Sequence, residues 1–164
     1  MAVDIVPFSP VFAAEFERLN RSWIEQSFTL EPPDLRLFAD PEGVIVRPGG
    51  QVFFALLDGK VVGTCAAVRH AESEFELAKM AVEPAARGRG IGRRLGLAVI
   101  AFARAAGGTV VTLLSSSRLP AALALYRDLG FVTRPLPGST GYARADVYME
   151  LALPRRAPGN GTGP

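Results

Sequence analysis

Apolar residues recur along this chain with two periods, which predict a mixture of strands and helices. Short apolar runs between turn residues predict strands at residues 5–8, 52–57, 61–68, 75–82, 109–114 and 146–153, with shorter strands at 44–46 and 131–132. Apolar residues at helical spacing predict helices over residues 10–24, 31–41, 91–106 and 120–129. The pair Asp58-Gly59 between two apolar runs predicts a tight hairpin.

This order of elements predicts a single α/β (α+β) domain built around a mixed sheet. We place the domain at residues 1–153. Residues 154–164 are rich in glycine, proline and arginine, and we expect them to form a disordered tail.

The composition is that of an ordinary folded protein, with 49% hydrophobic and 21% charged residues and a net charge of only +2. A single cysteine, Cys65, and a single histidine exclude an internal disulfide and a Cys/His zinc site, so we expect no metal. No apolar run reaches membrane-spanning length, and residues 1–5 lack a signal-peptide pattern. We therefore expect a soluble, cytoplasmic protein without a membrane or nucleic-acid partner.

A glycine- and arginine-rich turn follows the predicted strand that ends at Val82. Three glycines at alternate positions precede a long helical pattern, so free backbone N–H groups and the positive end of the helix dipole meet there. Arginines surround the glycines, and together these groups predict a seat for a phosphate or pyrophosphate. The residues concerned are Arg87, Gly88, Arg89, Gly90, Ile91, Gly92, Arg93 and Arg94.

The spacing of the glycines excludes two common phosphate-binding loops. A dinucleotide fingerprint needs G-x-G-x-x-G, and the third glycine, Gly96, comes one place too late. A Walker loop needs a Lys-Ser or Lys-Thr pair, which this stretch lacks. Residues 82–92 instead resemble the acetyl-CoA signature of the GNAT superfamily of acyltransferases, V-x-P-x-x-[RQ]-G-x-G-[IL]-G. The resemblance implies the GNAT fold, acetyl-CoA as co-substrate, and cofactor contacts from Met80, Ala81 and Val82 as well as from the turn.

Residues 121–131 resemble a second GNAT block, A-x-x-L-Y-x-x-x-G-F. The resemblance implies that Tyr126 protonates the thiolate that leaves coenzyme A. A tyrosine that merely packs between helix and sheet is the structural alternative. Many family members carry an asparagine seven residues before this tyrosine to bind the pantetheine arm, but this chain has Leu119. One of three serines at 115–117 is a candidate replacement.

An acceptor amine must lose a proton before it attacks a thioester. Glu76 stands six residues before Val82, where the histone-acetyltransferase branch of the resembled family carries its general base; His70 is the second candidate. Strand alternation predicts Glu74, Glu76, Ala78, Met80 and Val82 on one face. Lys79 is then expected on the opposite face, paired with Glu31 or Asp34, and Cys65 is expected to be a buried core residue.

These observations favour an N-acetyltransferase that moves the acetyl group of acetyl-CoA directly to an amine. The acceptor is a small molecule or a peptide, and a homodimer is possible in this superfamily. A non-catalytic acyl-CoA-binding module and a nucleic-acid-binding protein are the alternatives. Aromatic and acidic groups available to hold a cationic amine are Trp23, Phe28, Glu31, Asp34 and Tyr142.

Overall fold

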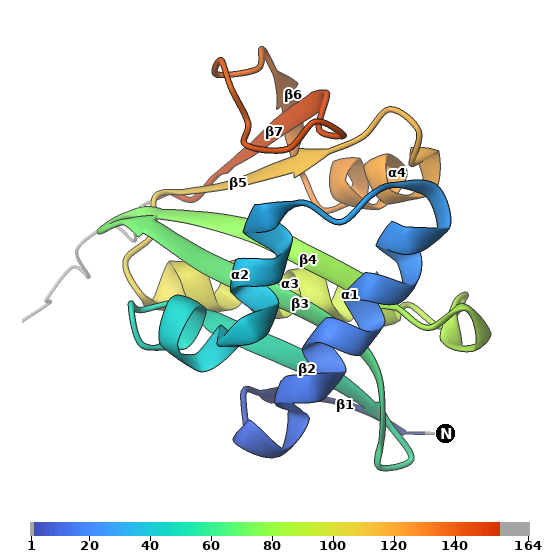
Figure 1. Ribbon diagram of the computed structural model, residues 1–164. Helices are drawn as coiled ribbons and strands as arrows, with labels where there is room; N and C mark the ends of the chain where they lie inside the picture. Colours follow the sequence, from blue (N-terminus) through green and yellow to red (C-terminus); the bar gives the residue numbers. More distant parts are fainter. Residues whose placement is uncertain (1, 155–164) are drawn as a thin grey trace, which may run out of the picture.

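Seven strands form one mixed sheet in the computed structural model of this chain, which describes residues 2–154 (Figure 1). The expected tail at residues 154–164 lies outside the described residues apart from Pro154. The strands lie in the order β1-β2-β3-β4-β5-β7-β6. Their bounds are β1 Val3–Pro7, β2 Gln51–Leu57, β3 Lys60–Ala71, β4 Glu74–Val82, β5 Val110–Ser115, β6 Val132–Arg134 and β7 Val147–Ala152.

Helices cover both faces of the sheet, as the predicted GNAT fold requires. The first two α-helices lie in front of the sheet in Figure 1 and bury Phe16, Ile24 and Phe38 against it, while the third lies behind and buries Leu95 and Val99. The fourth helix packs beside the third. Their bounds are α1 Ala13–Ser27, α2 Pro32–Ala39, α3 Ile91–Ala105 and α4 Pro120–Asp128, with shorter turns η1 Pro10–Phe12, η2 Glu42–Val46 and η3 Pro84–Ala86.

The sequence located most of these elements, including the hairpin between β2 and β3. Asp58 and Gly59 both have positive φ, as a tight two-residue hairpin turn requires. The expected strand at residues 44–46 is wrong, because these residues lie in the π-helical turn η2. The Asp40 side chain accepts a hydrogen bond from the Gly43 backbone, and the turn buries Ile45. Three apolar residues do not by themselves distinguish a strand from a helical turn.

The two central strands β4 and β5 separate along their length. They pair in parallel only over Glu74–Glu76 and Val110–Thr112, at the left of Figure 1, and then diverge while β5 continues beside β7. From Leu77 onward the β4 edge that faces β5 is therefore released from the sheet. This divergence opens the centre of the sheet to ligands.

A β-bulge interrupts the regular alternation of β4. The pairing with β3 shifts between Ala78 and Ala81, and Lys79 has a φ of +56°. As a result Met80 and Val82 pack with the core on the α3 side, whereas Lys79 reaches Asp34 of α2 on the other side. The expected single face for Glu76, Met80 and Val82 is wrong for this reason. Lys79 lies opposite Met80 and Val82, as expected, but on the same side as Glu76.

Candidate active site

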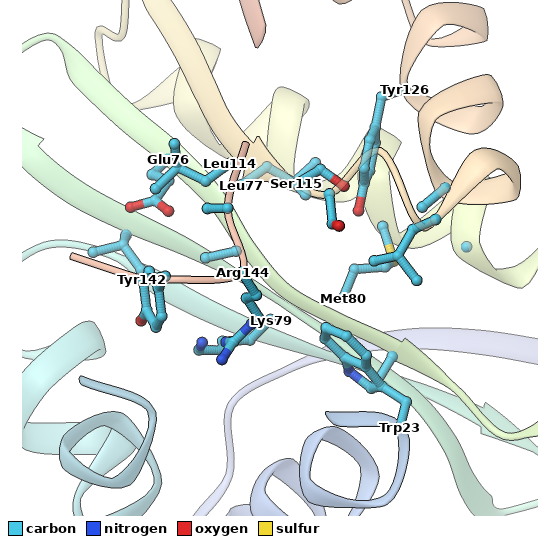
Figure 2. Close-up of a pocket in the computed structure, with 18 of the residues that line it drawn as sticks. Trp23, Glu76, Leu77, Lys79, Met80, Leu114, Ser115, Tyr126, Tyr142 and Arg144 are labelled. Carbon is cyan, nitrogen blue, oxygen red and sulfur yellow. The ribbon is translucent and has the colours of Figure 1, made fainter. Parts of the chain in front are cut away.

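A cavity of about 860 Å³ occupies the gap between β4 and β5 (Figure 2). One wall is formed by β4 from Glu76 to Val82, and the other by the end of β5 and the start of α4. Side chains from α1 and from the segment before β7 close the remaining side, with Trp23 and Tyr142 among them. The cavity therefore connects elements that are far apart in the sequence.

The glycine- and arginine-rich turn lies at one end of this cavity. Gly88 and Gly90 have φ values of +80° and +72°, and a Cβ added at either would meet no atom within 4 Å. Gly90 is the N-cap of α3, so the first backbone N–H groups of this helix have no intrahelical acceptor. Arg87 and Gly92 line the cavity directly. The turn thus presents open space, backbone donors and positive charge together.

The other residues of the predicted pyrophosphate seat are placed differently. Arg89 is exposed, the Ile91 side chain is buried in the core, and the Arg93 side chain forms an ion pair with Asp128. The buried Ile91 side chain can thus offer a ligand at this helix end only its backbone N–H. Met80, Ala81 and Val82 all line the cavity, as expected from the resemblance.

Tyr126 reaches the cavity from α4, and its hydroxyl points toward Ser115 in Figure 2. The side chain is 8% exposed and its ring packs edge-on against Phe131. Burial raises the pKa of the Tyr126 hydroxyl, with a smaller contribution from Cys65. The phenol is therefore protonated at neutral pH. Leu119, Ser115 and Ser116 line the same part of the cavity, whereas the Ser117 hydroxyl donates a hydrogen bond to Asp146.

Glu76 and His70 form a hydrogen-bonded pair at the opposite end of the cavity. The distance between His70 Nε2 and Glu76 Oε1 is 2.6 Å, and both residues line the cavity. The hydrogen bond to Glu76 raises the pKa of His70, and burial opposes this rise. The Glu76 side chain is 18% exposed, against 48% for His70. The two candidate bases predicted from the sequence are thus neighbours.

Lys79 and Arg144 both bind the buried Asp34 of α2. Lys79 forms an ion pair with Asp34, as predicted, and the Arg144 guanidinium donates to both Asp34 oxygens and to Glu31. Burial raises the pKa of Asp34, but the hydrogen bonds from Arg144 and Lys79 outweigh this effect and lower it to about 2. Burial lowers the pKa of Lys79, against the opposing effect of Asp34.

The expectation that Glu31 and Asp34 hold a cationic amine is wrong. Asp34 is 0% exposed and is already bound by two cations, and Glu31 accepts bonds from Arg144 and from the Ala143 backbone. Neither carboxylate lines the cavity. Lys79 and Arg144 line the cavity instead. The sequence did not reveal this, because Arg144 lies 110 residues from Asp34 along the chain.

Aromatic rings complete this end of the cavity. The Tyr142 ring lies 4.5 Å from Lys79 Nζ and 4.7 Å from the Arg144 guanidinium carbon, measured to the ring centroid. Trp23 lines the cavity and also packs edge-on against Phe28, so it contributes both to the wall and to the core around α1. Phe28 lies outside the lining and stacks with Arg118.

The arrangement of a split sheet, a glycine turn and a cavity between β4 and β5 defines a class of acyltransferases. Residues 13–131 match the model of the Acetyltransferase (GNAT) family, so the chain belongs to this family.

Relatives and solved structures agree with this assignment. The N-acetylaspartate synthetase of Rattus norvegicus is 38% identical over 116 residues, which span 70% of this chain and 38% of the relative. A GNAT acetyltransferase structure from Staphylococcus aureus has a TM-score of 0.85 at 21% identity, covering 93% of this chain and all of that one. The yncA structure of Salmonella typhimurium, which holds its cofactor acetyl-CoA, has a TM-score of 0.74 at 21% identity and covers 98% of this chain and 99% of its own.

Residues 2–154 lack two further features. No helix there is long and apolar enough to cross a membrane. No group of three or more His, Cys, Asp or Glu side chains in the same residues is arranged to hold a metal ion.

Proposed function

We propose that this enzyme transfers the acetyl group of acetyl-CoA directly to the amine of a small molecule or peptide. One observation carries the proposal: a single cavity is lined by Arg87 and Gly92 of the glycine turn, by Tyr126, and by Glu76. A candidate phosphate-binding turn, a candidate acid and a candidate base thus line the same cavity, as direct acyl transfer needs. The name of the relative N-acetylaspartate synthetase, which denotes an N-acetylated product, supports the same reaction.

The residues of the turn fit the pyrophosphate of coenzyme A. The space beside Gly88 and Gly90 admits phosphate oxygens close to the backbone, and the α3 N-terminus supplies donors and a favourable dipole. The Arg87 side chain adds positive charge at the cavity mouth. Farther in, the free β4 edge at Met80, Ala81 and Val82 offers backbone groups to the pantetheine amides.

Acetyl-CoA supplies the acetyl group as a thioester, and the chain supplies two proton transfers. Glu76, hydrogen-bonded to His70, accepts a proton from the acceptor ammonium, which frees the nitrogen lone pair. The nitrogen forms a bond to the acetyl carbon, and the carbon–sulfur bond breaks. Tyr126, kept protonated by burial, donates its hydrogen to the departing thiolate and recovers it from the amine nitrogen through solvent.

The experiment that tests this proposal measures thiol release from acetyl-CoA with a panel of amines. We expect release that depends on both the protein and an amine, together with thermal stabilisation by coenzyme A. Stabilisation without release from any amine would favour an acyl-CoA-binding module instead. Strongly salt-dependent DNA binding that coenzyme A does not displace would favour a nucleic-acid-binding protein. A cytoplasmic location and a homodimer stay predictions.

A further inference from the structure

We infer that the acceptor amine carries a carboxylate, which Lys79 and Arg144 bind at the end of the cavity away from the glycine turn. The inference rests on the proposed function, because it names the substrate class of the same site. Both cations line the cavity (Figure 2). Both form ion pairs with Asp34 behind the cavity wall.

The charge of the cavity wall supports an anionic group on the acceptor. Among the described residues that line the cavity, Glu76 is the single carboxylate. The cationic side chains in the same lining are Arg36, Arg69, Lys79, Arg87, Arg118 and Arg144. Arg87 belongs to the glycine turn, but Arg36, Arg69, Lys79 and Arg144 come from α2, β3, β4 and the segment before β7. Asp34 and Glu31 balance the charges of Lys79 and Arg144 from behind the wall, but the groups of this cluster that line the cavity are the cations, which suit an anionic group on the acceptor.

The hydrogen-bond donors of Lys79 and Arg144 exceed the acceptors that the fold gives them. Lys79 uses one of its three ammonium donors on Asp34, and Arg144 uses three of its five on Asp34 and Glu31. The two side chains are only 6% and 12% exposed, so bulk water reaches them through the cavity that they line. Buried donors of this kind need a partner, and a carboxylate satisfies several of them at once.

Asp34 makes this pair of cations a rigid receptor. It is fully buried, its Oδ2 accepts the Glu31 backbone N–H in the capping box of α2, and both oxygens bind cations. The Tyr142 ring also packs against both cations. The positions of Lys79 and Arg144 are therefore fixed before an acceptor arrives, which lowers the entropic cost of binding.

The opposite charge lies at Glu76 on the same wall. Its negative charge acts on both Lys79 and Tyr142, so it lies close to this cluster. An acceptor with an ammonium directed to Glu76 and a carboxylate directed to Lys79 and Arg144 matches both signs. Free amino acids have this chemistry, and so do peptides whose first residue carries a side-chain carboxylate.

The test compares amines that differ only in the carboxylate. Thiol release from acetyl-CoA is measured for amino acids and their carboxamides, and for dipeptides that begin with aspartate or asparagine. The enzyme is expected to use either free amino acids or dipeptides. Within that class, we expect kcat/KM to be at least about tenfold higher for the amine with the carboxylate than for its amide partner. A preference for the carboxylate among free amino acids identifies amino acids as the acceptors. The same preference among dipeptides identifies peptides as the acceptors. Equal kcat/KM values for both members of every pair overturn the inference but leave the proposed function intact.

Absence of thiol release with every amine would overturn the proposed function. In that case, the carboxylate inference is tested by ligand binding alone. Isothermal titration of the same acid and carboxamide pairs, and of the same dipeptide pairs, into the protein saturated with coenzyme A measures carboxylate binding without turnover. Heat of binding for the carboxylate member of a pair and none for its amide partner supports the inference. Equal binding of the two members of every pair, or binding of neither, overturns it.

Variants connect the preference to the two cations. Lys79→Gln keeps a hydrogen-bond donor for Asp34 and removes the charge, so we expect KM for the carboxylate-bearing amine to rise about tenfold while KM for acetyl-CoA is unchanged. Arg144→Lys retains the positive charge next to Asp34 but loses the planar guanidinium that can bind a carboxylate with two hydrogen bonds. This variant provides the test if Lys79→Gln does not fold. Arg134→Gln, an exposed site on β6 outside the cavity lining, is the control. An unchanged KM in both Lys79→Gln and Arg144→Lys overturns the assignment.

Discussion

The Nε2 atom of His70 lies 2.6 Å from Oε1 of Glu76, and this hydrogen bond joins the end of β3 to the start of β4 at the cavity wall. Glu76 is the more buried partner and His70 the more exposed one. The pair therefore offers a route by which a proton taken from an acceptor amine at Glu76 passes to His70 and on to solvent.

Replacing Glu76 by Gln is expected to lower the pKa of His70 toward its ordinary value of about 6.5, because the hydrogen bond that His70 donates to Glu76 is the largest cause of the rise. Since the pKa is raised in the folded state, the pair stabilises the fold at pH values below the ordinary pKa. This stabilisation is lost as the pH rises through the folded-state pKa. His70 is the one histidine of the chain, so its ring protons report the titration directly by NMR.

Glu74→Gln is the matched control for that titration. The negative charge of Glu74 makes the smallest contribution to the raised pKa of His70, so its removal should lower this pKa by less. An unchanged pKa of His70 in Glu76→Gln would contradict the pairing.

Tyr126→Phe is expected to lower kcat by about 100-fold while the affinity for acetyl-CoA stays nearly constant, because the variant removes only the proton donor. The measurement is steady-state thiol release together with titration of coenzyme A by calorimetry. Tyr148→Phe removes a hydroxyl that donates to Glu150, outside the cavity lining, and should keep full activity. A fully active Tyr126→Phe would remove this residue from the mechanism.

The fold and one half of the site follow from local sequence. The glycine turn, its strand and its helix lie within residues 75–105, so their spacing alone predicts the arrangement around Gly90. Tyr126 is found in the same way, because its block of residues is contiguous.

The other half of the site, formed by Lys79, Asp34 and Arg144, depends on contacts between residues that are far apart in the sequence. The bulge at Lys79 needs a positive φ that β3 and Asp34 impose on a residue with no intrinsic preference for it. Strict strand alternation therefore wrongly placed Glu76 on the face of Met80 and Val82, opposite Lys79. Asp34 looked like an available carboxylate because Arg144, which binds it, arrives only with the segment before β7.

Gly90→Glu is expected to abolish binding of coenzyme A, because it places a carboxylate where the phosphates are proposed to lie. Gly59→Glu is a close control: both glycines have positive φ, +72° and +80°, and a Cβ at either meets no atom within 4 Å. Both variants should therefore lose a similar stability of about 1 kcal/mol from backbone strain. Calorimetry should find coenzyme A binding only in Gly59→Glu, and retained affinity in Gly90→Glu would refute the pyrophosphate assignment.

Asp34→Asn is expected to destabilise the fold by about 3 kcal/mol at pH 7, because it leaves Lys79 and Arg144 as buried cations with a weakened partner. Asp128→Asn is the control on an exposed ion pair. Asp128 and Arg93 are 66% and 48% exposed, so this change should cost less than about 1 kcal/mol. Urea denaturation measures both values, and equal losses would contradict the role of Asp34.

The difference in unfolding free energy between wild type and Asp34→Asn, measured as a function of pH, separates the effect of the Asp34 charge from the effect of its shape. The pKa of Asp34 is lowered from 3.8 to about 2 in the folded chain, so its ionised form contributes about 2 kcal/mol at pH values above 3.8. That contribution is lost as the pH falls through about 2, where the wild-type carboxyl becomes protonated and resembles the amide of Asp34→Asn. The difference in unfolding free energy between wild type and Asp34→Asn should therefore narrow from pH 5 toward pH 2, to the extent that the fold survives there. A difference that stays constant over this range would mean that packing around Asp34, and not its charge, holds Lys79 and Arg144 in place.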